Sequence, residues 1–126
     1  MQVKVIDTGF YIHNTPLEQV QLEGAKIVVN VDDTDEQRWR LVFSPYQALR
    51  VTTIDCIDIA PFLINDKKSN QVLEVIDSDW INLLRITLKN TDSSASFLDK
   101  SKHYIIPLQD NVIEIISWDL YIAGKI

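Results

Sequence analysis

The chain has 126 residues, of which 46% are hydrophobic and 24% charged, and 18 acidic against 12 basic side chains give a net charge of −6. With 3 Gly, 4 Pro and 1 Cys, the composition excludes a collagen-like or low-complexity chain and a disulfide-rich scaffold. Ile and Val number 17 and 11 against 5 Ala, which favours strands over a helical bundle. We therefore expect one β-rich domain over residues 1–126.

Alternating apolar and polar side chains predict strands through the first half of the chain. Weak segments at 3–7 and 10–13 are followed by an ambiguous stretch at 17–22, and then by strands at 26–31, 38–43 and 47–54. We expect turns between the last three strands, at the polar run 32–37 and at Ser44-Pro45-Tyr46. This order predicts an antiparallel meander.

The second half of the chain carries one amphipathic helix, expected at about 77–89. Asp77 or Ser78 can cap its first turn. Apolar side chains recur at helical spacing on one face, at Trp80, Leu83, Leu84 and Thr87 or Leu88. A short helical turn at 58–64 and a strand at 71–76 come before it, and strands at 102–108 and 112–118 form a C-terminal hairpin. The fold class predicted is α+β, a mostly antiparallel sheet of about six to eight strands, curled around or packed on one helix.

The residue types that build familiar catalytic and metal sites are scarce. His13 and His103 show no metal-ligand spacing, so we expect neither a metal nor a cofactor. Three glycines in the whole chain leave no phosphate-binding loop and no Gly-x-Ser-x-Gly elbow. Spacing does not exclude a nucleophile–His–acid triad, because its members converge in space. We interpret the chain as non-enzymatic.

The densest acidic run consists of Asp32, Asp33, Asp35 and Glu36. It resembles half of a calcium-binding loop but lacks the Gly that the EF-hand requires. Because the run joins two predicted strands, we interpret it as a solvated hairpin loop. Its negative potential suits a basic protein partner, so these four residues are a candidate interaction site.

Arginines near the middle of the chain form a second candidate. Arg38 and Arg40 share one face of a predicted strand, and an antiparallel neighbour would bring Arg50 close to them. Guanidinium groups bind carboxylates or phosphates, so they serve either as cross-strand partners for acidic residues or as an anion site. The full candidate polar cluster is Arg38, Arg40, Arg50, His103, Tyr104 and Asp110. The last four would serve a small-ligand binder or hydrolase if one pocket joined them.

Location and partner classes follow from the remaining patterns. No leader pattern and no apolar run of about 20 residues occurs, so we expect a cytoplasmic protein without membrane contact. Basic residues gather only weakly, at Lys67-Lys68 and at Lys100 and Lys102, which argues against nucleic-acid binding. Cys56, beside Asp55, is expected to be a small buried apolar residue. The apolar segment 119–126 could add a strand to a second copy and form a homo-oligomer.

From Trp39 onward, the order of motifs resembles a family of small uncharacterised bacterial β-rich domains. The motifs are Trp39-x-Leu41-x-Phe43, Tyr46-x-x-x-Arg50-Val51-Thr52, Asp77-Ser78-x-Trp80-Ile81, Lys102-His103-Tyr104-x-Ile106 and Asp110-x-x-x-Glu114-Ile115. Some similarly built acidic domains are immunity proteins against bacterial toxins. The resemblance implies no functional residue and does not extend to the first third of the chain.

Three functional hypotheses remain from the sequence. The first is a non-enzymatic bacterial protein-binding domain of the immunity or accessory type, using an acidic surface. The second is a self-associating structural module. The third is a binder of a small anionic ligand, or a hydrolase.

Overall fold

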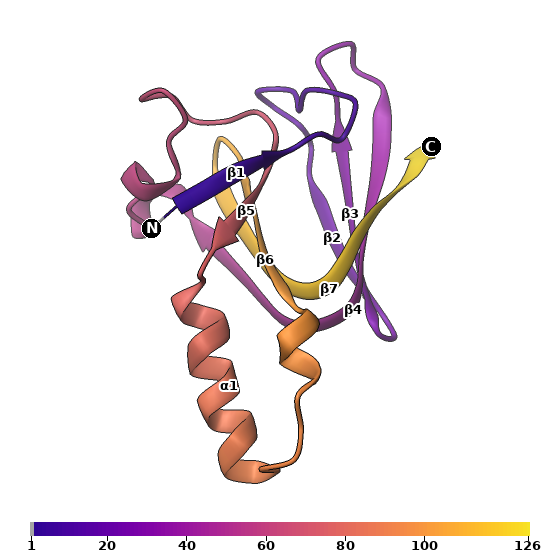
Figure 1. The fold of residues 1–126 in the computed structure, drawn as a ribbon. Coiled ribbons are helices and arrows are strands. Elements are labelled where there is room, and N and C mark those ends of the chain that lie inside the picture. Colours follow the sequence, from indigo (N-terminus) through magenta and orange to yellow (C-terminus); the bar gives the residue numbers. More distant parts are fainter. Residues whose placement is uncertain (1) are drawn as a thin grey trace.

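The computed structural model describes residues 2–126, which form one curled sheet of seven strands and a single α-helix (Figure 1). The order across the sheet is β1-β5-β6-β7-β4-β3-β2, and all neighbours are antiparallel. This confirms the expected mostly antiparallel sheet with one helix. The elements are β1 (Gln2–Ile6), β2 (Gln19–Glu23), β3 (Lys26–Asp32), β4 (Arg38–Thr53), β5 (Val72–Ile76), α1 (Asp79–Thr91), β6 (Lys102–Pro107) and β7 (Asn111–Lys125).

Strand β4 corrects the expected meander. The segments predicted as two strands, 38–43 and 47–54, form one strand of 16 residues, with Ser44-Pro45-Tyr46 inside it. The register of β4 against β7 shifts between Tyr46 and Ala48, and such an irregularity bends a strand without reversing it. β7 is also longer than the arm predicted at 112–118, and its second half pairs with the first half of β4. These two long, bent strands curl the sheet.

Residues 10–13, predicted as a strand, do not join the sheet as one. We call these residues the crossing segment, because they cross one end of the sheet. Ile12 makes only an isolated bridge to Asp33, because Phe10 turns inward and stacks on Trp39 with 4.4 Å between ring centres. The Ile12 N–H donates to the Asn70 carbonyl, which ties the crossing segment to the chain before β5. Of the ambiguous stretch at 17–22, residues 19–22 belong to β2 and residues 17–18 are loop.

Apolar side chains cover both faces of the central strands. The inner face packs side chains of β3, β4, β6 and β7 around the fully buried Phe43 and Leu41. On the other face of β5 and β6, the loop 54–64 packs Phe62 against Leu73 and Ile105. Within this loop, the turn expected near Pro61 is a short 3-10 helix, Ala60–Phe62. Cys56 is exposed at the end of the preceding turn, because that turn faces solvent, so the expected burial was wrong.

Helix α1 confirms the expected helix and most of its packed face, since Trp80, Leu84 and Leu88 pack against the core. Ser78 caps it, and Ile81 is buried beside Leu98 and Ile116. Leu83, expected on the packed face, is exposed. The helix meets the sheet only at its base and otherwise packs on the turn Phe97–Lys100, so it projects from the body of the molecule (Figure 1). No helix within residues 2–126 is long and apolar enough to cross a membrane.

Candidate functional site

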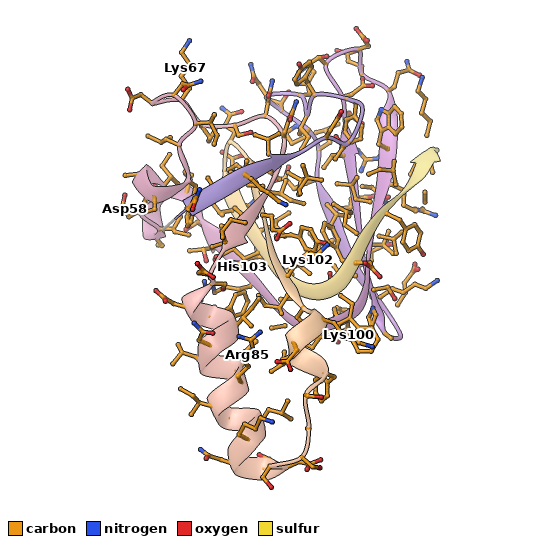
Figure 2. The ribbon with its side chains drawn as sticks, viewed as in Figure 1. Asp58, Lys67, Arg85, Lys100, Lys102 and His103 are labelled. Atoms are coloured by element: carbon orange, nitrogen blue, oxygen red, sulfur yellow. The ribbon has the colours of Figure 1, made fainter. Side chains whose placement is uncertain are left out.

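Four polar side chains form a continuous chain where α1 joins the sheet. Ser78 ends the turn between β5 and α1, His103 lies on β6, Glu114 on β7 and Arg50 on β4. Figure 2 shows His103 at this junction, directly above the start of the helix. Because β6, β7 and β4 are consecutive in the sheet, residues from distant parts of the sequence meet here.

The contacts along this chain are short and largely buried. Ser78 Oγ lies 2.7 Å from His103 Nδ1, and His103 Nε2 lies 3.0 Å from Glu114 Oε1. Arg50, directly opposite Glu114 in the sheet register, donates from Nε and Nη2 to its two carboxylate oxygens at 2.8 and 2.9 Å. Ser78, His103 and Glu114 are 5%, 3% and 1% exposed, and only Arg50 reaches solvent to a large extent.

The charge of Glu114 fixes the direction of the hydrogen bonds that it accepts. Burial alone would raise the pKa of Glu114, but hydrogen bonds from His103 and Arg50 and the charge of Arg50 lower it to about 2. An ionised carboxylate only accepts, so His103 donates to Glu114 from Nε2. In the tautomer whose single ring proton is on Nε2, Nδ1 accepts from the Ser78 hydroxyl, and the Ser78 oxygen accepts the Ile81 N–H at 3.2 Å.

A pocket of about 370 Å³ opens beside these polar groups. Its walls are mostly apolar, and its lining residues include Ile57, Pro61, Phe62, Trp80 and Leu83 together with Ser78, His103, Glu114 and Arg50. The Arg50 guanidinium lies 4.1 Å from the Trp80 ring centre, and Trp80 meets the His103 ring edge-on at 5.3 Å. An apolar concavity with a few convergent polar groups is typical of a binding site.

The rim of this pocket is acidic. Asp58 and Asp79 line it, both are exposed, and neither forms an ion pair within residues 2–126. Exposed Leu83 lies at the same rim. We call the pocket and these three residues the basal pocket.

Comparison with known proteins supplies no relative from which a role could be transferred. No protein-family model, curated protein or solved structure matches the chain. The geometry and charge of the basal pocket are therefore the basis for assigning a function.

The structure joins only two residues of the candidate polar cluster. Arg50 and His103 meet through Glu114, which sequence reasoning did not single out. Tyr104 points to the opposite face of β6, where it packs edge-on against Phe43, and burial raises its pKa to about 12. Asp110 is exposed in the turn between β6 and β7. The hydrolase built on Arg50, His103, Tyr104 and Asp110 therefore has no common pocket.

The other two arginines of that cluster lie near the far end of β4. Arg38 pairs with Asp32 at 2.9 Å and also donates to the Leu17 carbonyl. Arg40 donates to Asn30 Oδ1 at 3.2 Å. Both side chains bind residues of the neighbouring strand β3. They lie near the start of β4 and Arg50 lies near its end, so most of the length of β4 separates them from Arg50.

The acidic hairpin loop uses two of its four charges internally. Asp33 is buried and accepts hydrogen bonds from the Trp39 indole at 2.7 Å and from the backbone N–H groups of Asp35 and Gln37. The bond from Trp39 is the main cause that lowers the pKa of Asp33. Asp32 is paired with Arg38. Only Asp35 and Glu36 remain as loop charges that are exposed and have no ion-pair partner among the described residues.

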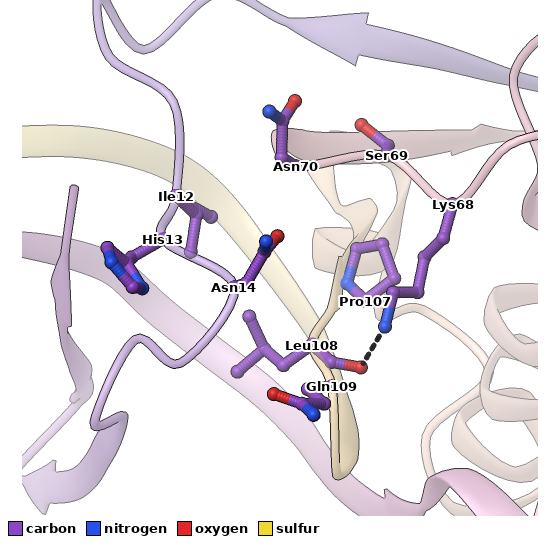
Figure 3. A pocket seen from close by; sticks show the side chains of 9 residues that line it. All are labelled: Ile12, His13, Asn14, Lys68, Ser69, Asn70, Pro107, Leu108 and Gln109. Carbon is purple, nitrogen blue, oxygen red and sulfur yellow. Dashed lines mark hydrogen bonds between the residues drawn. The ribbon is translucent and has the colours of Figure 1, made fainter. Parts of the chain in front are cut away.

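A second cavity, of about 250 Å³, lies at the crossing segment and has a different character (Figure 3). Lys68 Nζ donates to the Leu108 carbonyl at 3.0 Å, and the His13 ring accepts the Thr15 N–H at 2.9 Å. Its polar groups are thus used in holding the loops together. Within residues 2–126, no three side chains of the metal-binding types come together.

Proposed function

We propose that the chain is a protein-binding domain and that its partner docks at the basal pocket. The observation that carries this proposal is the exposed Leu83 at the rim of a mostly apolar concavity. Exposed apolar surface beside a pocket is a common mark of an interaction site. The hydrogen bonds among Ser78, His103, Glu114 and Arg50 make the pocket more rigid. They join three strands to the base of the helix.

The partner proposed is basic. The chain has a net charge of −6, and the two carboxylates of the rim, Asp58 and Asp79, have no ion-pair partner among the described residues. A Lys or Arg of the partner could lay its aliphatic stem on Leu83 while its charged end meets these carboxylates. The same acidic rim disfavours the alternative of a small anionic ligand.

Helix α1 supports a contact that extends beyond the pocket. Ile86 is exposed on the side of the helix away from the sheet, while Ile81 is buried toward it. A helix with apolar side chains around most of its circumference is normally covered on all sides. Among residues 2–126, only the base and one side of the helix are covered, so the outer side is available to the partner.

The finer assignment is a bacterial, cytoplasmic protein of the immunity or accessory type. An immunity protein binds a toxin and blocks it, a role that needs a rigid acidic surface and no chemistry. The small size, the negative charge and the resemblance in the motifs from Trp39 onward support this assignment.

A different protein is a better partner than a second copy. The segment proposed for self-association, 119–126, pairs with β4 of its own chain. Its remaining edge is distorted, since the register shifts beside Gly124, which has a φ of 111°. Irregular edges of this kind hinder the addition of further strands.

Affinity capture from a bacterial lysate, quantified by mass spectrometry, tests the proposal with two variants. Leu83 and Leu17 are 62% and 69% exposed, and Leu17 lies near the Arg38 end of β4, away from the pocket. We expect a basic protein that is captured by the wild type and by Leu17→Asp but lost with Leu83→Asp. Equal capture by both variants contradicts docking at the basal pocket.

A further inference from the structure

We propose that Ser78 is a nucleophile and that the basal pocket hydrolyses small carboxylic esters with apolar acyl groups. Ser78, His103 and Glu114 have the order of a nucleophile, a base and an orienting carboxylate, with contacts of 2.7 and 3.0 Å. This activity goes beyond the protein-binding role proposed above, although it uses the same pocket.

One tautomer of His103, with its single ring proton on Nε2, gives the hydrogen-bond directions that acyl transfer requires. In this tautomer Nδ1, 2.7 Å from Ser78 Oγ, accepts from the hydroxyl and takes its proton when the oxygen attacks. Glu114 accepts the hydrogen bond from Nε2. Its negative charge stabilises the positive charge that the ring acquires when it takes the serine proton. In serine proteases Nε2 faces the serine and Nδ1 faces the carboxylate, the reverse of the order here. The chemistry requires only that one ring nitrogen accepts from the serine and that the other donates to the carboxylate.

The backbone supplies donors next to the nucleophile. The turn from β5 into α1 is sharp, with Asp77 in the left-handed region at a φ of 54° and Ser78 directly before the helix. The first N–H groups of a helix have no acceptor within it. The N–H of Asp79 directly follows the nucleophile, as does one of the oxyanion donors of serine hydrolases with a strand–turn–helix nucleophile, and the N–H of Trp80 comes next in the first turn of α1.

The reaction proceeds in two balanced steps. Ser78 Oγ attacks the ester carbonyl, its proton passes to His103 Nδ1, and the alcohol leaves with that proton as the acyl-serine forms. Water then attacks the acyl-serine, gives a proton to His103 and releases the carboxylic acid, while the proton returns to Ser78. No oxidant, metal or cofactor is consumed.

The other side chains at the pocket position the catalytic groups or form the wall that contacts the substrate. Arg50 is a positioning residue, because it fixes both oxygens of Glu114 and does not itself reach Ser78. Trp80 and Phe62 contribute apolar pocket wall, which suits a short apolar acyl chain.

Labelling with a fluorophosphonate probe tests the proposal on the whole chain. We expect one adduct by intact mass, mapped to Ser78 by peptide sequencing, and hydrolysis of p-nitrophenyl acetate and butyrate above the solution rate. Ser78→Gly should remove both signals while keeping the helix, because Gly is a tolerated cap. Ser93→Gly, at an exposed loop serine, should keep both.

Glu114→Gln separates catalysis from capping. Its labelling rate should fall roughly 100-fold if His103 acts as the base, with the fold checked by circular dichroism. An absence of adduct on folded wild type, or equal labelling of Ser78 and Ser93, would overturn the proposal and leave Ser78 as a helix cap alone.

Discussion

At the scale of single residues, Glu114 is a carboxylate in the middle of an apolar strand, between Ile113 and Ile115. Its side chain is buried and receives hydrogen bonds from His103 and Arg50. Removing one partner of a buried ion pair is costly because the other charge remains.

We therefore expect Glu114→Gln to lower the free energy of unfolding at pH 7 by about 2–3 kcal/mol, somewhat less than the roughly 3–5 kcal/mol of a fully buried pair, because Arg50 is half-exposed. Urea denaturation measures this. Glu74→Gln is the matched control, because Glu74 pairs with the exposed Lys4 at 3.7 Å and such pairs contribute less than about 1 kcal/mol. Equal losses for the two variants would contradict the role given to Glu114.

The same carboxylate predicts a pH dependence. The pKa of Glu114 is about 2 in the folded chain against an ordinary 4.5, so its contribution is complete above pH 4.5 and is lost as the pH falls toward 2. The stability difference between wild type and Glu114→Gln should shrink as the pH falls from 5 to 2. Urea midpoints across this range measure it, and a constant difference would refute the assignment.

Asp33 and Asp35 make a second pair of contrasting residues. Asp33→Asn should lower the urea midpoint, because a neutral amide accepts more weakly from the Trp39 indole and from two backbone N–H groups. Asp35→Asn changes an exposed side chain and should leave the midpoint unchanged. A lower urea midpoint for Asp35→Asn than for Asp33→Asn would contradict the stabilising role given to Asp33.

At the scale of elements, the alternation of side chains was enough to predict most strands, the helix and its cap. It did not reveal that β4 is continuous, because Ser44-Pro45-Tyr46 carries the local signal of a turn. Whether such a segment reverses or bends depends on pairing with β7, more than sixty positions away in sequence. The helical spacing of apolar residues likewise predicted an apolar face. It could not show where the sheet ends beneath the helix, so the prediction that Leu83 packs was wrong.

The packed face of α1 can be tested directly. Ile81→Ala should lower the free energy of unfolding by about 2–4 kcal/mol, since it leaves a cavity beside Leu98 and Ile116. Leu83→Ala should change it by less than about 0.5 kcal/mol, because Leu83 is exposed. Urea denaturation compares them, and a large loss for Leu83→Ala would place this residue in the core.

At the scale of the whole molecule, the candidate site depends on the order of strands in the sheet. Ser78 was identified as a cap and His103 as a candidate, but their meeting with Glu114 and Arg50 requires β6, β7 and β4 to be neighbours. Sequence spacing carries no such information. The one local signal of Glu114 was a charge within an apolar strand, which implies a buried partner.

The pairing of residues 119–125 with β4 also predicts the assembly state. We expect a monomer in sedimentation velocity from low to high micromolar protein, because the segment offered for self-association is already used. A concentration-dependent dimer that is abolished by Asp119→Lys and restored by adding Lys125→Asp would show that the free edge of β7 pairs after all.

The most direct measurement for the basal pocket is isothermal titration calorimetry of the captured partner with the wild type, Leu83→Asp and Leu17→Asp. We predict that Leu83→Asp weakens binding at least tenfold, which corresponds to about 1.4 kcal/mol, and that Leu17→Asp stays within about twofold. An unchanged Kd for Leu83→Asp would contradict docking at the base of α1.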